Sequence, residues 1–429
     1  MTDDGAVTAS APTRKPLVLR RHDFRQLFSA DVAAQVGTQL STLAIPVTAV
    51  ELLGARELEM GLLGTAENLA FLLIALPAGV WVDRWRKQRV LVAADLVRAV
   101  ALLTIPLAWW LDVLSFAQLL LVTTVIGTAT VFFDVAYQSY LPEIVEPDEI
   151  GEGNAQLQAV QSVAMIGGPA LGGALVRLVG APLTSLLNAL GFLGSAFFVR
   201  RIRHVATPPA REDRRPLRVE VREGLAFVLG HPLLWRITAC TAISNLFSAA
   251  TGALLVLFAL RELGLTEAQL GLALGIGAAG GLLGALATPA LTRWCGEGRV
   301  IPLSALVMVP AGLPMPLAGT VLDPVVAVVV SSLLLTFSVV VYNVAQVSFR
   351  QRLCPRPLLG RMNASIRFCV WGVMPVGAFA GGLLGEGVGA RGVFWIALAG
   401  QLVAAAPVVL SPLVGMRELP RELDRLSER

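Results

Sequence analysis

The 429-residue sequence has few of the residues that build metal sites and disulfide frameworks. Its three histidines are His22, His204 and His231, and its four cysteines include no CxxC pair and no partner at a metal-ligand spacing. Charged residues make up only 15% of the chain, whereas hydrophobic residues make up 55%. This composition excludes a zinc or disulfide scaffold and argues against a soluble protein, so we expect an all-α membrane protein with no metal and no cofactor.

Apolar runs separated by polar segments predict twelve transmembrane helices. The first six are expected at 24–51, 58–82, 90–111, 115–138, 155–178 and 183–199. The second six are expected at 237–260, 268–291, 300–320, 324–348, 364–385 and 392–413. The first of these runs is too long for a signal peptide and lacks a cleavage site, so we expect it to remain as the first span.

The positions of Lys and Arg predict how the chain crosses the membrane. When Arg25 and Arg177, at the ends of their spans, are counted with the adjoining segments, the side of the N-terminus holds 28 of the 34, whereas the opposite side holds only Arg56, Arg177, Arg261 and Arg391. Cytoplasmic loops carry the excess of positive charge, so both termini are expected in the cytoplasm and the protein in a cell (inner or plasma) membrane. The basic residues are spread over many loops rather than gathered on one surface, which argues against nucleic acid as a partner.

The sequence also repeats itself at an offset of 209 residues. This offset aligns Arg84-Trp85 with Arg293-Trp294 and Asn154-Ala155 with Asn363-Ala364. Two repeats related by an axis along the membrane normal are the layout of a large class of transporters. The predicted units are a tail (1–23), a six-helix bundle (24–203), a linker (204–236), a second six-helix bundle (237–413) and a tail (414–429). Within the linker, 217–229 is either an amphipathic helix on the inner leaflet or an ordered connection.

The loop after the second span carries the most specific motif. Gly79, Asp83, Arg84 and Arg89 resemble the signature loop of the major facilitator superfamily, with Arg86 where that pattern has glycine. The resemblance covers nearly the whole chain and implies a fold of two pseudo-symmetric six-helix bundles. The stretch 132–142 resembles the exporter branch that includes macrolide-efflux and enterobactin-exporter-like proteins.

The resemblance implies a gate built from charged side chains. In the family such charges hold the two halves together in the outward-facing state and separate in the inward-facing state. The expected gating residues are Gly79, Asp83, Arg84, Arg89, Asp95, Arg98, Asp134 and Arg367. For Asp95 and Arg98, three residues apart on one helix, the alternative is a static ion pair that neutralises itself.

The fifth span contains a second motif, formed by Gly168, Pro169, Gly172 and Gly173. It resembles the motif of the family's antiporters, which exchange a substrate for protons. The arginine that drug antiporters of the family often carry in the fourth span is missing, so another group must carry the proton. Glu67, about nine residues or roughly 14 Å from the outer end of its span, is the first candidate and Asp31 the second. The alternative for both is a hydrogen-bonded structural acid.

We expect the substrate to bind between the two halves. The candidate cavity residues are aromatic or uncharged polar: Gln35, Gln39, Asn68, Phe133, Tyr137, Asn245, Phe247, Tyr342, Asn343 and Trp371. Their chemistry suits a bulky, hydrophobic small molecule. The predicted function is proton-coupled export of such a molecule by a monomer, energised by the proton gradient across the lipid bilayer. The alternatives are an importer or uniporter of the same fold and a polytopic membrane enzyme, although the loops contain no evident catalytic group.

Overall fold

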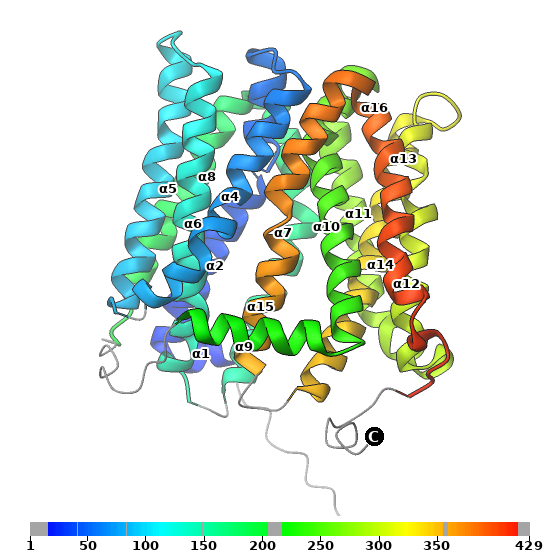
Figure 1. The fold of residues 1–429 in the computed structure, drawn as a ribbon. Helices are drawn as coiled ribbons and strands as arrows, with labels where there is room; N and C mark the ends of the chain where they lie inside the picture. Colours follow the sequence, from blue (N-terminus) through cyan, green and yellow to red (C-terminus); the bar gives the residue numbers. More distant parts are fainter. Residues whose placement is uncertain are drawn as a thin grey trace, which may run out of the picture.

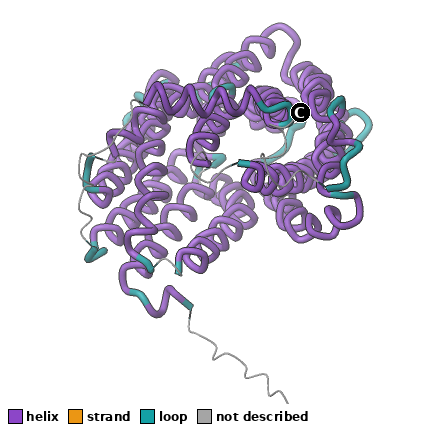
Figure 2. Tube along the Cα trace, turned by 60° about the horizontal axis from the view of Figure 1, so that its bottom comes forward, coloured by secondary structure: helices purple, strands orange, loops and turns teal. Residues whose placement is uncertain are grey.

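The computed structural model describes residues 16–40, 42–82, 84–146, 149–204, 217–354 and 359–418, and these residues are almost entirely helical (Figure 2). Asp83 and the outer parts of both tails, 1–15 and 419–429, lie outside the described residues. Nine helical stretches within the described residues are long and apolar enough to cross a membrane, and one of them, Ser365–Val409, is long enough to cross twice.

The first half of the chain forms one bundle (left in Figure 1). Its elements are α1 (Leu17–Arg20), α2 (His22–Leu40), α3 (Ala44–Val47), the π-helical turn η1 (Thr48–Leu52), α4 (Glu57–Val82), α5 (Lys87–Trp110), α6 (Phe116–Ile144), α7 (Ile150–Val179) and α8 (Ala181–Arg200). Together, α2 with η1 and the helices α4 to α8 account for the six predicted spans. The structure therefore has the expected all-α fold in this half.

The second half forms the other bundle. Its elements are α10 (Leu234–Leu257), the π-helical turn η2 (Phe258–Glu262), α11 (Glu267–Cys295), α12 (Glu297–Gly312), α13 (Pro314–Leu317), α14 (Pro324–Leu353), α15 (Leu359–Trp371), α16 (Met374–Val409) and the short η4 (Pro412–Val414). In the linker, where the sequence allows either an amphipathic helix or an ordered connection, the structure has a helix, α9 (Leu217–Gly230). It lies across the end of the molecule that holds α1 (Figure 1). Its contact with a membrane surface stays a prediction.

Matched backbone features mark the internal repeat. The π-helical turns η1 and η2 occupy corresponding places, and each is followed by a glycine with positive φ, Gly54 at +65° and Gly264 at +66°. Gly180 separates α7 from α8 at φ +88°, and Gly389 bends α16 at the corresponding place at φ +74°. A left-handed backbone disfavours residues with a Cβ, so glycine at these positions lets the chain turn between spans. These pairs lie 210 and 209 residues apart, in agreement with the repeat in the sequence.

Three predicted spans are broken rather than continuous, and proline accounts for the position of each break. The expected helix 24–51 is interrupted at Thr42, and Pro46 cannot donate the bond that the Thr42 carbonyl would accept. The expected helix 364–385 is interrupted at Gly372 and Val373, where Pro375 leaves the carbonyl of Trp371 without its helical donor. In 300–320, Pro314 starts the separate α13.

The two bundles meet most closely at the end of the molecule away from α1 and α9, which we call the distal end; the end with α1 and α9 is the proximal end. There α4 packs against α16 and α7 against α11. A Cβ built on Gly61 would lie 2.6 Å from the Cα of Gly382, and one on Gly271 would lie 2.9 Å from the Cα of Gly173. The Arg261 guanidinium adds a hydrogen bond of 2.9 Å to the carbonyl of Val50 across the two halves. The distal end is therefore closed.

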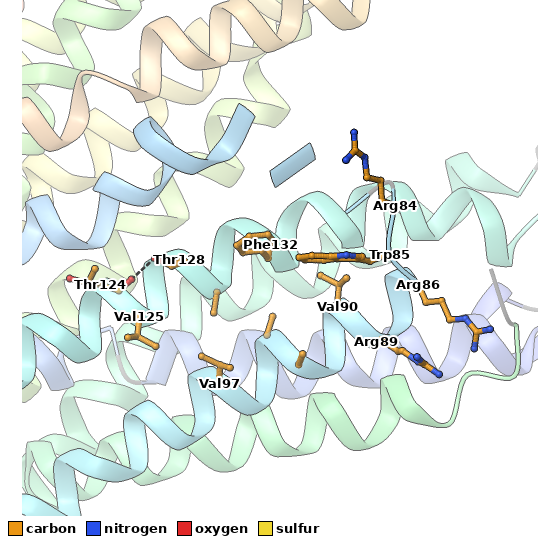
Figure 3. A pocket seen from close by; sticks show the side chains of 13 residues that line it. Arg84, Trp85, Arg86, Arg89, Val90, Val97, Thr124, Val125, Thr128 and Phe132 are labelled. Atoms are coloured by element: carbon orange, nitrogen blue, oxygen red, sulfur yellow. Dashed lines mark hydrogen bonds between the residues drawn. The ribbon is translucent and has the colours of Figure 1, made fainter. Parts of the chain in front are cut away.

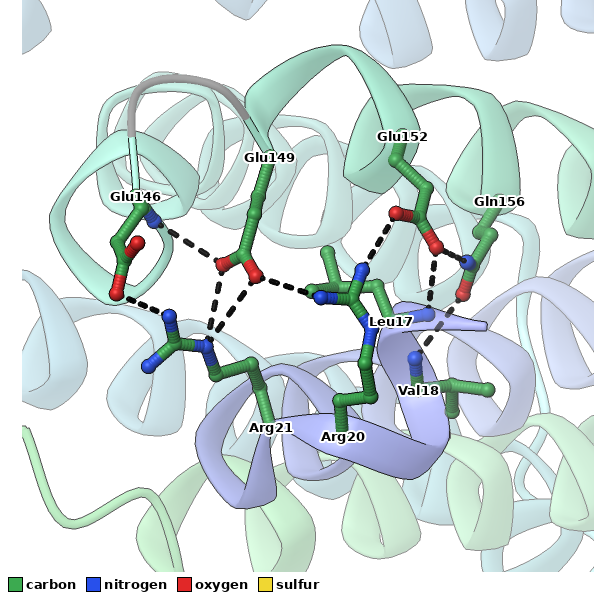
Figure 4. Close-up of polar contacts among 8 residues, drawn as sticks. All are labelled: Leu17, Val18, Arg20, Arg21, Glu146, Glu149, Glu152 and Gln156. Carbon is green, nitrogen blue, oxygen red and sulfur yellow. Dashed lines mark hydrogen bonds and ion pairs between the residues drawn. The ribbon is translucent and has the colours of Figure 1, made fainter. Parts of the chain in front are cut away.

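The N-terminal helix α1 is fixed to the proximal end by ion pairs (Figure 4). Arg20 contacts Glu149 at 3.0 Å and Glu152 at 2.7 Å, and Arg21 contacts Glu149 at 3.2 Å and also pairs with Glu146. Glu149, whose side chain is only 7% exposed, lies between the two guanidinium groups. These contacts tie α1 to the connection between α6 and α7, and the hydrogen bond to Glu146, together with its negative charge, raises the pKa of Arg21.

Candidate functional site

A cavity of about 380 Å³ lies inside the first bundle. Its walls come from α2, α3, α4, α5, α6 and α8, and it brings together seven of the residues singled out from the sequence: Asp31, Gln35, Glu67, Asn68, Arg98, Phe133 and Asp134. The rest of the lining combines aliphatic and aromatic side chains such as Leu63, Phe71, Ile126 and Phe192 with the polar side chains of Thr38, Thr42, Thr123, Thr130 and Asn188. The cavity is therefore mostly apolar with a few charged groups.

Three carboxylates and one guanidinium share this cavity. Glu67, on α4, exposes its side chain to the cavity, whereas Asp31, on α2, is only 7% exposed and has Gln35 and Tyr137 beside it. Asp134, on α6, is half-buried. The described residues give Glu67 no hydrogen bond and no ion pair. The sequence candidates for proton exchange thus lie together in one cavity, with fewer positive than negative groups.

The positive group of the cavity, Arg98, is held in place on several sides. It forms an ion pair with Asp95, one turn earlier on α5, and Asp95 is fully buried. The guanidinium carbon lies 4.3 Å from the ring centre of Phe133 and 4.1 Å from that of Phe192. A cation between two aromatic faces is attracted by both rings. Asp95 and Arg98 therefore form an ion pair within one helix, as in the static alternative that the sequence also allowed. A gating role for the two residues stays a prediction.

Arg367 links the two bundles near the proximal side of the cavity. Its Nη1 donates a hydrogen bond of 3.3 Å to Oε1 of Gln138 on α6, and its guanidinium lies 5.0 Å from the ring centre of Trp371. Asp134 lies within the electrostatic reach of both Arg98 and Arg367. In a structure whose distal end is closed, Arg367 thus still contacts the first bundle. Gln138 was not singled out from the sequence, because nothing in its local pattern indicates a partner 229 residues away.

The remaining cavity candidates divide between packing and contact across the halves. Asn245 donates a hydrogen bond of 2.7 Å to the carbonyl of Val370, and the Tyr342 hydroxyl lies 2.9 Å from Oγ1 of Thr241. Trp371 packs against Phe71 of the first bundle in a T-shaped arrangement, with ring centres 5.3 Å apart. The other candidates, Gln39, Tyr137, Phe247 and Asn343, are not among the residues that line the cavity. All of the residues that line this cavity come from the first half of the chain.

The signature loop shows contacts that the sequence pattern did not predict. Arg84 and Arg89 are exposed. Lys87, in contrast, donates a hydrogen bond of 3.1 Å to the carbonyl of Ser139 and forms an ion pair with Glu143 at the end of α6. Gln88 donates to the carbonyls of Val199 and Ile202, at 3.0 and 2.8 Å. The loop is thus tied to α6 and α8. The predicted contacts of Asp83 lie outside the described residues, and Gly79 lies near the end of α4.

The glycines of the fifth-span motif allow α7 to approach two neighbours. A Cβ on Gly168 would overlap the side chain of Gln39 on α2, and one on Gly173 would overlap the carbonyl oxygen of Glu267 on α11. Pro169 lies inside α7 without interrupting it, and Gly172 is buried. The motif therefore lets α7 pack closely against α2 of its own bundle at Gly168 and against α11 of the other bundle at Gly173.

Five polar residues of the cavity were not singled out from the sequence, namely the four threonines of its lining and Asn188. Asn188, on α8, lines the cavity, is 8% exposed, and its Oδ1 has no hydrogen-bond partner among the described residues. Its signal in the sequence is a single amide in an otherwise apolar span. A buried amide oxygen without a partner is a free acceptor that faces the same space as Asp31.

Comparisons with known proteins agree on one family. The Major Facilitator Superfamily profile matches residues 27–375. Proteins named multidrug efflux pump Tap are 27% identical, from Mycobacterium tuberculosis (92% of this chain, 93% of that protein) and Mycolicibacterium fortuitum (94% and 97%). A bacterial homologue of the iron transporter ferroportin, in an inward-facing state, has a TM-score of 0.69 at 20% identity and covers 92% of this chain and 99% of its own. The nucleoside transporter NupG (D323A mutant) has a TM-score of 0.70 at 14% identity, and the match covers 91% of this chain and 99% of that chain.

Proposed function

The chain belongs to the major facilitator superfamily and is a multi-pass membrane transporter, and from this we propose that it exports a hydrophobic small molecule in exchange for protons. We place both chain ends in the cytoplasm and the protein, as a monomer, in the cell membrane. The proton gradient is then the energy source. The relatives named multidrug efflux pumps support export over import, which the fold by itself also permits.

One observation carries the coupling part of this proposal: Asp31, Glu67 and Asp134 share a cavity whose guanidinium, Arg98, is already paired with Asp95. Carboxylates without a fixed counter-ion can bind and release protons as access to the cavity changes. Because Glu67 has no hydrogen bond and no ion pair among the described residues, it is the group that we assign to the proton.

The cavity also supports a bulky apolar substrate. Phe71, Phe133 and Phe192 contribute aromatic surface, and Asn68 and Asn188 contribute polar groups that can orient a ligand. Pockets with mostly apolar walls and a few convergent polar groups are typical of sites for small organic molecules. The volume of about 380 Å³ is that of the part inside the first bundle.

The test is transport in proteoliposomes that contain the purified protein, the fluorescent dye Hoechst 33342 as substrate and a trapped pH indicator. We expect substrate movement to accelerate with an imposed pH gradient and to carry protons in the opposite direction. Glu67→Gln should abolish the dependence on the gradient while substrate exchange without a gradient continues. The matched control is Glu59→Gln on the same helix, outside the cavity, where the carboxylate accepts from the backbone of Arg56 at 2.8 Å. Transport indifferent to the gradient in the wild type would refute proton coupling.

A further inference from the structure

A long apolar groove runs along the outside of the first bundle between α5 and α6. Its first part, about 810 Å³, is lined by Arg84, Trp85, Arg86, Arg89, Val90, Ala93, Ala94, Val97, Thr124, Val125, Thr128, Ala129 and Phe132. A second hollow of about 520 Å³ shares Val97 and Val125 with it and continues toward the distal end. The side chains of Val97, Val100 and Leu121 are 46%, 62% and 64% exposed. In a transmembrane bundle such exposed apolar side chains face lipid, so hydrocarbon chains fill this groove.

Aromatic rings form the proximal end of the groove (Figure 3). Phe132 stacks against Trp85 with ring centres 6.2 Å apart and planes 23° apart, and against Trp81 at 6.0 Å and 10°. Trp85 is 52% exposed. Indole rings are enriched where hydrocarbon meets the headgroup layer. The stack therefore marks the depth at which the groove passes from acyl chains to lipid headgroups.

Three arginines surround this aromatic end. Figure 3 shows Arg84 on one side of Trp85 and Arg86 and Arg89 on the other. All three are exposed, and within the described residues their guanidinium groups have no ion pair and no hydrogen bond. Lys87 of the same loop, in contrast, is neutralised by Glu143. The loop thus presents a concentration of uncompensated positive charge at headgroup depth.

We propose that this groove binds an anionic phospholipid, with an acyl chain along α5 and α6 and the headgroup phosphate among Arg84, Arg86 and Arg89. Basic pockets between transmembrane helices bind acidic lipid headgroups, because arginine offers several donors to phosphate oxygens. A zwitterionic lipid would fill the groove but leave the arginines without a counter-charge. Free phosphate would contact the arginines but leave the groove unused. An anionic phospholipid satisfies both parts of the site.

The experiment measures quenching of Trp85 by lipids brominated near the headgroup. The full-length protein is placed in vesicles in which brominated phosphatidylglycerol is titrated against unlabelled phosphatidylcholine, or brominated phosphatidylcholine against unlabelled phosphatidylglycerol. The difference between each protein and its Trp85→Phe version isolates the Trp85 signal. We expect the mole fraction that gives half-quenching to be about tenfold lower for the anionic lipid, the sum of several arginine contacts.

Two variants test the two parts of the site. In the triple variant Arg84→Gln, Arg86→Gln and Arg89→Gln, the ratio between the half-quenching mole fractions of the two lipids should fall from about ten to about one. The matched control removes three exposed arginines of the proximal end that lie outside the groove, Arg200, Arg201 and Arg293, and should keep it. Ala93→Phe narrows the groove without changing charge and should weaken quenching by both lipids.

The outcomes separate the possible ligands. Equal quenching by the two lipids in the wild type, or a preference that survives the triple variant, would overturn the proposal and leave a groove filled by bulk lipid. Loss of the preference in the control variant would show a general charge effect instead. A preference removed by 10 mM inorganic phosphate, at constant ionic strength, would identify a phosphate site that does not need the lipid. Should the triple variant not fold, the phosphate competition and Ala93→Phe still decide the question.

Discussion

Adding a methyl group to Gly271 tests whether the glycine contacts hold the distal end closed. The new Cβ would overlap the carbonyl oxygen of Pro169 and lie 2.9 Å from the Cα of Gly173, so α11 and α7 must move apart. Overpacking of a close contact costs about 1–3 kcal/mol. This cost applies only while the distal end is closed. Gly271→Ala should therefore reduce the ratio of closed to open molecules by about 5- to 150-fold, while the protein still folds.

The assay is a distance measurement between spin labels on the distal loops of the two halves. Val113 and Val321 are 64% and 75% exposed, one in each half, and can be replaced by cysteine after the native cysteines have been removed. We expect the long-distance population to increase in Gly271→Ala. Gly167→Ala is the matched control, because a Cβ on Gly167 has no atom within 4 Å. An unchanged distance distribution in Gly271→Ala, or the same change in Gly167→Ala, would refute the assignment.

Three further predictions concern stability and packing. Burial lowers the pKa of His231, whose neutral Nδ1 accepts from two backbone N–H groups, so thermal stability should fall as pH drops below about 6.5, and His231→Asn should flatten this dependence. Glu149→Gln should lower stability by about 1–3 kcal/mol in denaturant unfolding, whereas the exposed Glu146→Gln should cost less than about 1 kcal/mol. Tyr342→Phe should cost about 1 kcal/mol and leave the apparent substrate KM unchanged; a raised KM would make Tyr342 a substrate contact instead of a packing residue.

The membrane fold could be predicted from sequence because each span is a long apolar run that has to satisfy its backbone internally as a helix. The repeat was equally accessible, since the turn glycines Gly180 and Gly389 recur at the same offset as the sequence matches. The interruptions were not. Pro375 coincides with a break, whereas Pro169 lies in an unbroken helix, and the sequence alone does not tell these two cases apart.

The candidate site was predictable in one half and not in the other. Asp31, Glu67 and Asp134 are acids in apolar spans, which is a rare and informative pattern, and they meet in one cavity. Tyr342 and Asn245 are also polar residues in apolar spans, yet they do not line the cavity. Tyr342 contacts Thr241, and Asn245 donates a hydrogen bond to the carbonyl of Val370. Whether a polar side chain faces a cavity or a neighbouring helix depends on helix rotation, which apolar periodicity fixes only weakly in a membrane.

The break between α15 and α16 divides the eleventh span into two pieces, of which only the shorter one carries Arg367. That shorter piece also packs against α9, the helix of the segment that joins the two halves. A displacement of the connecting segment would therefore reach α15 through a direct contact, and α15 is separated from α16 by the non-helical Gly372 and Val373. A displacement of the 13-residue α15 can then change the contact between Arg367 and Gln138 at the proximal end, while the close approach of Gly61 to Gly382 at the distal end is kept.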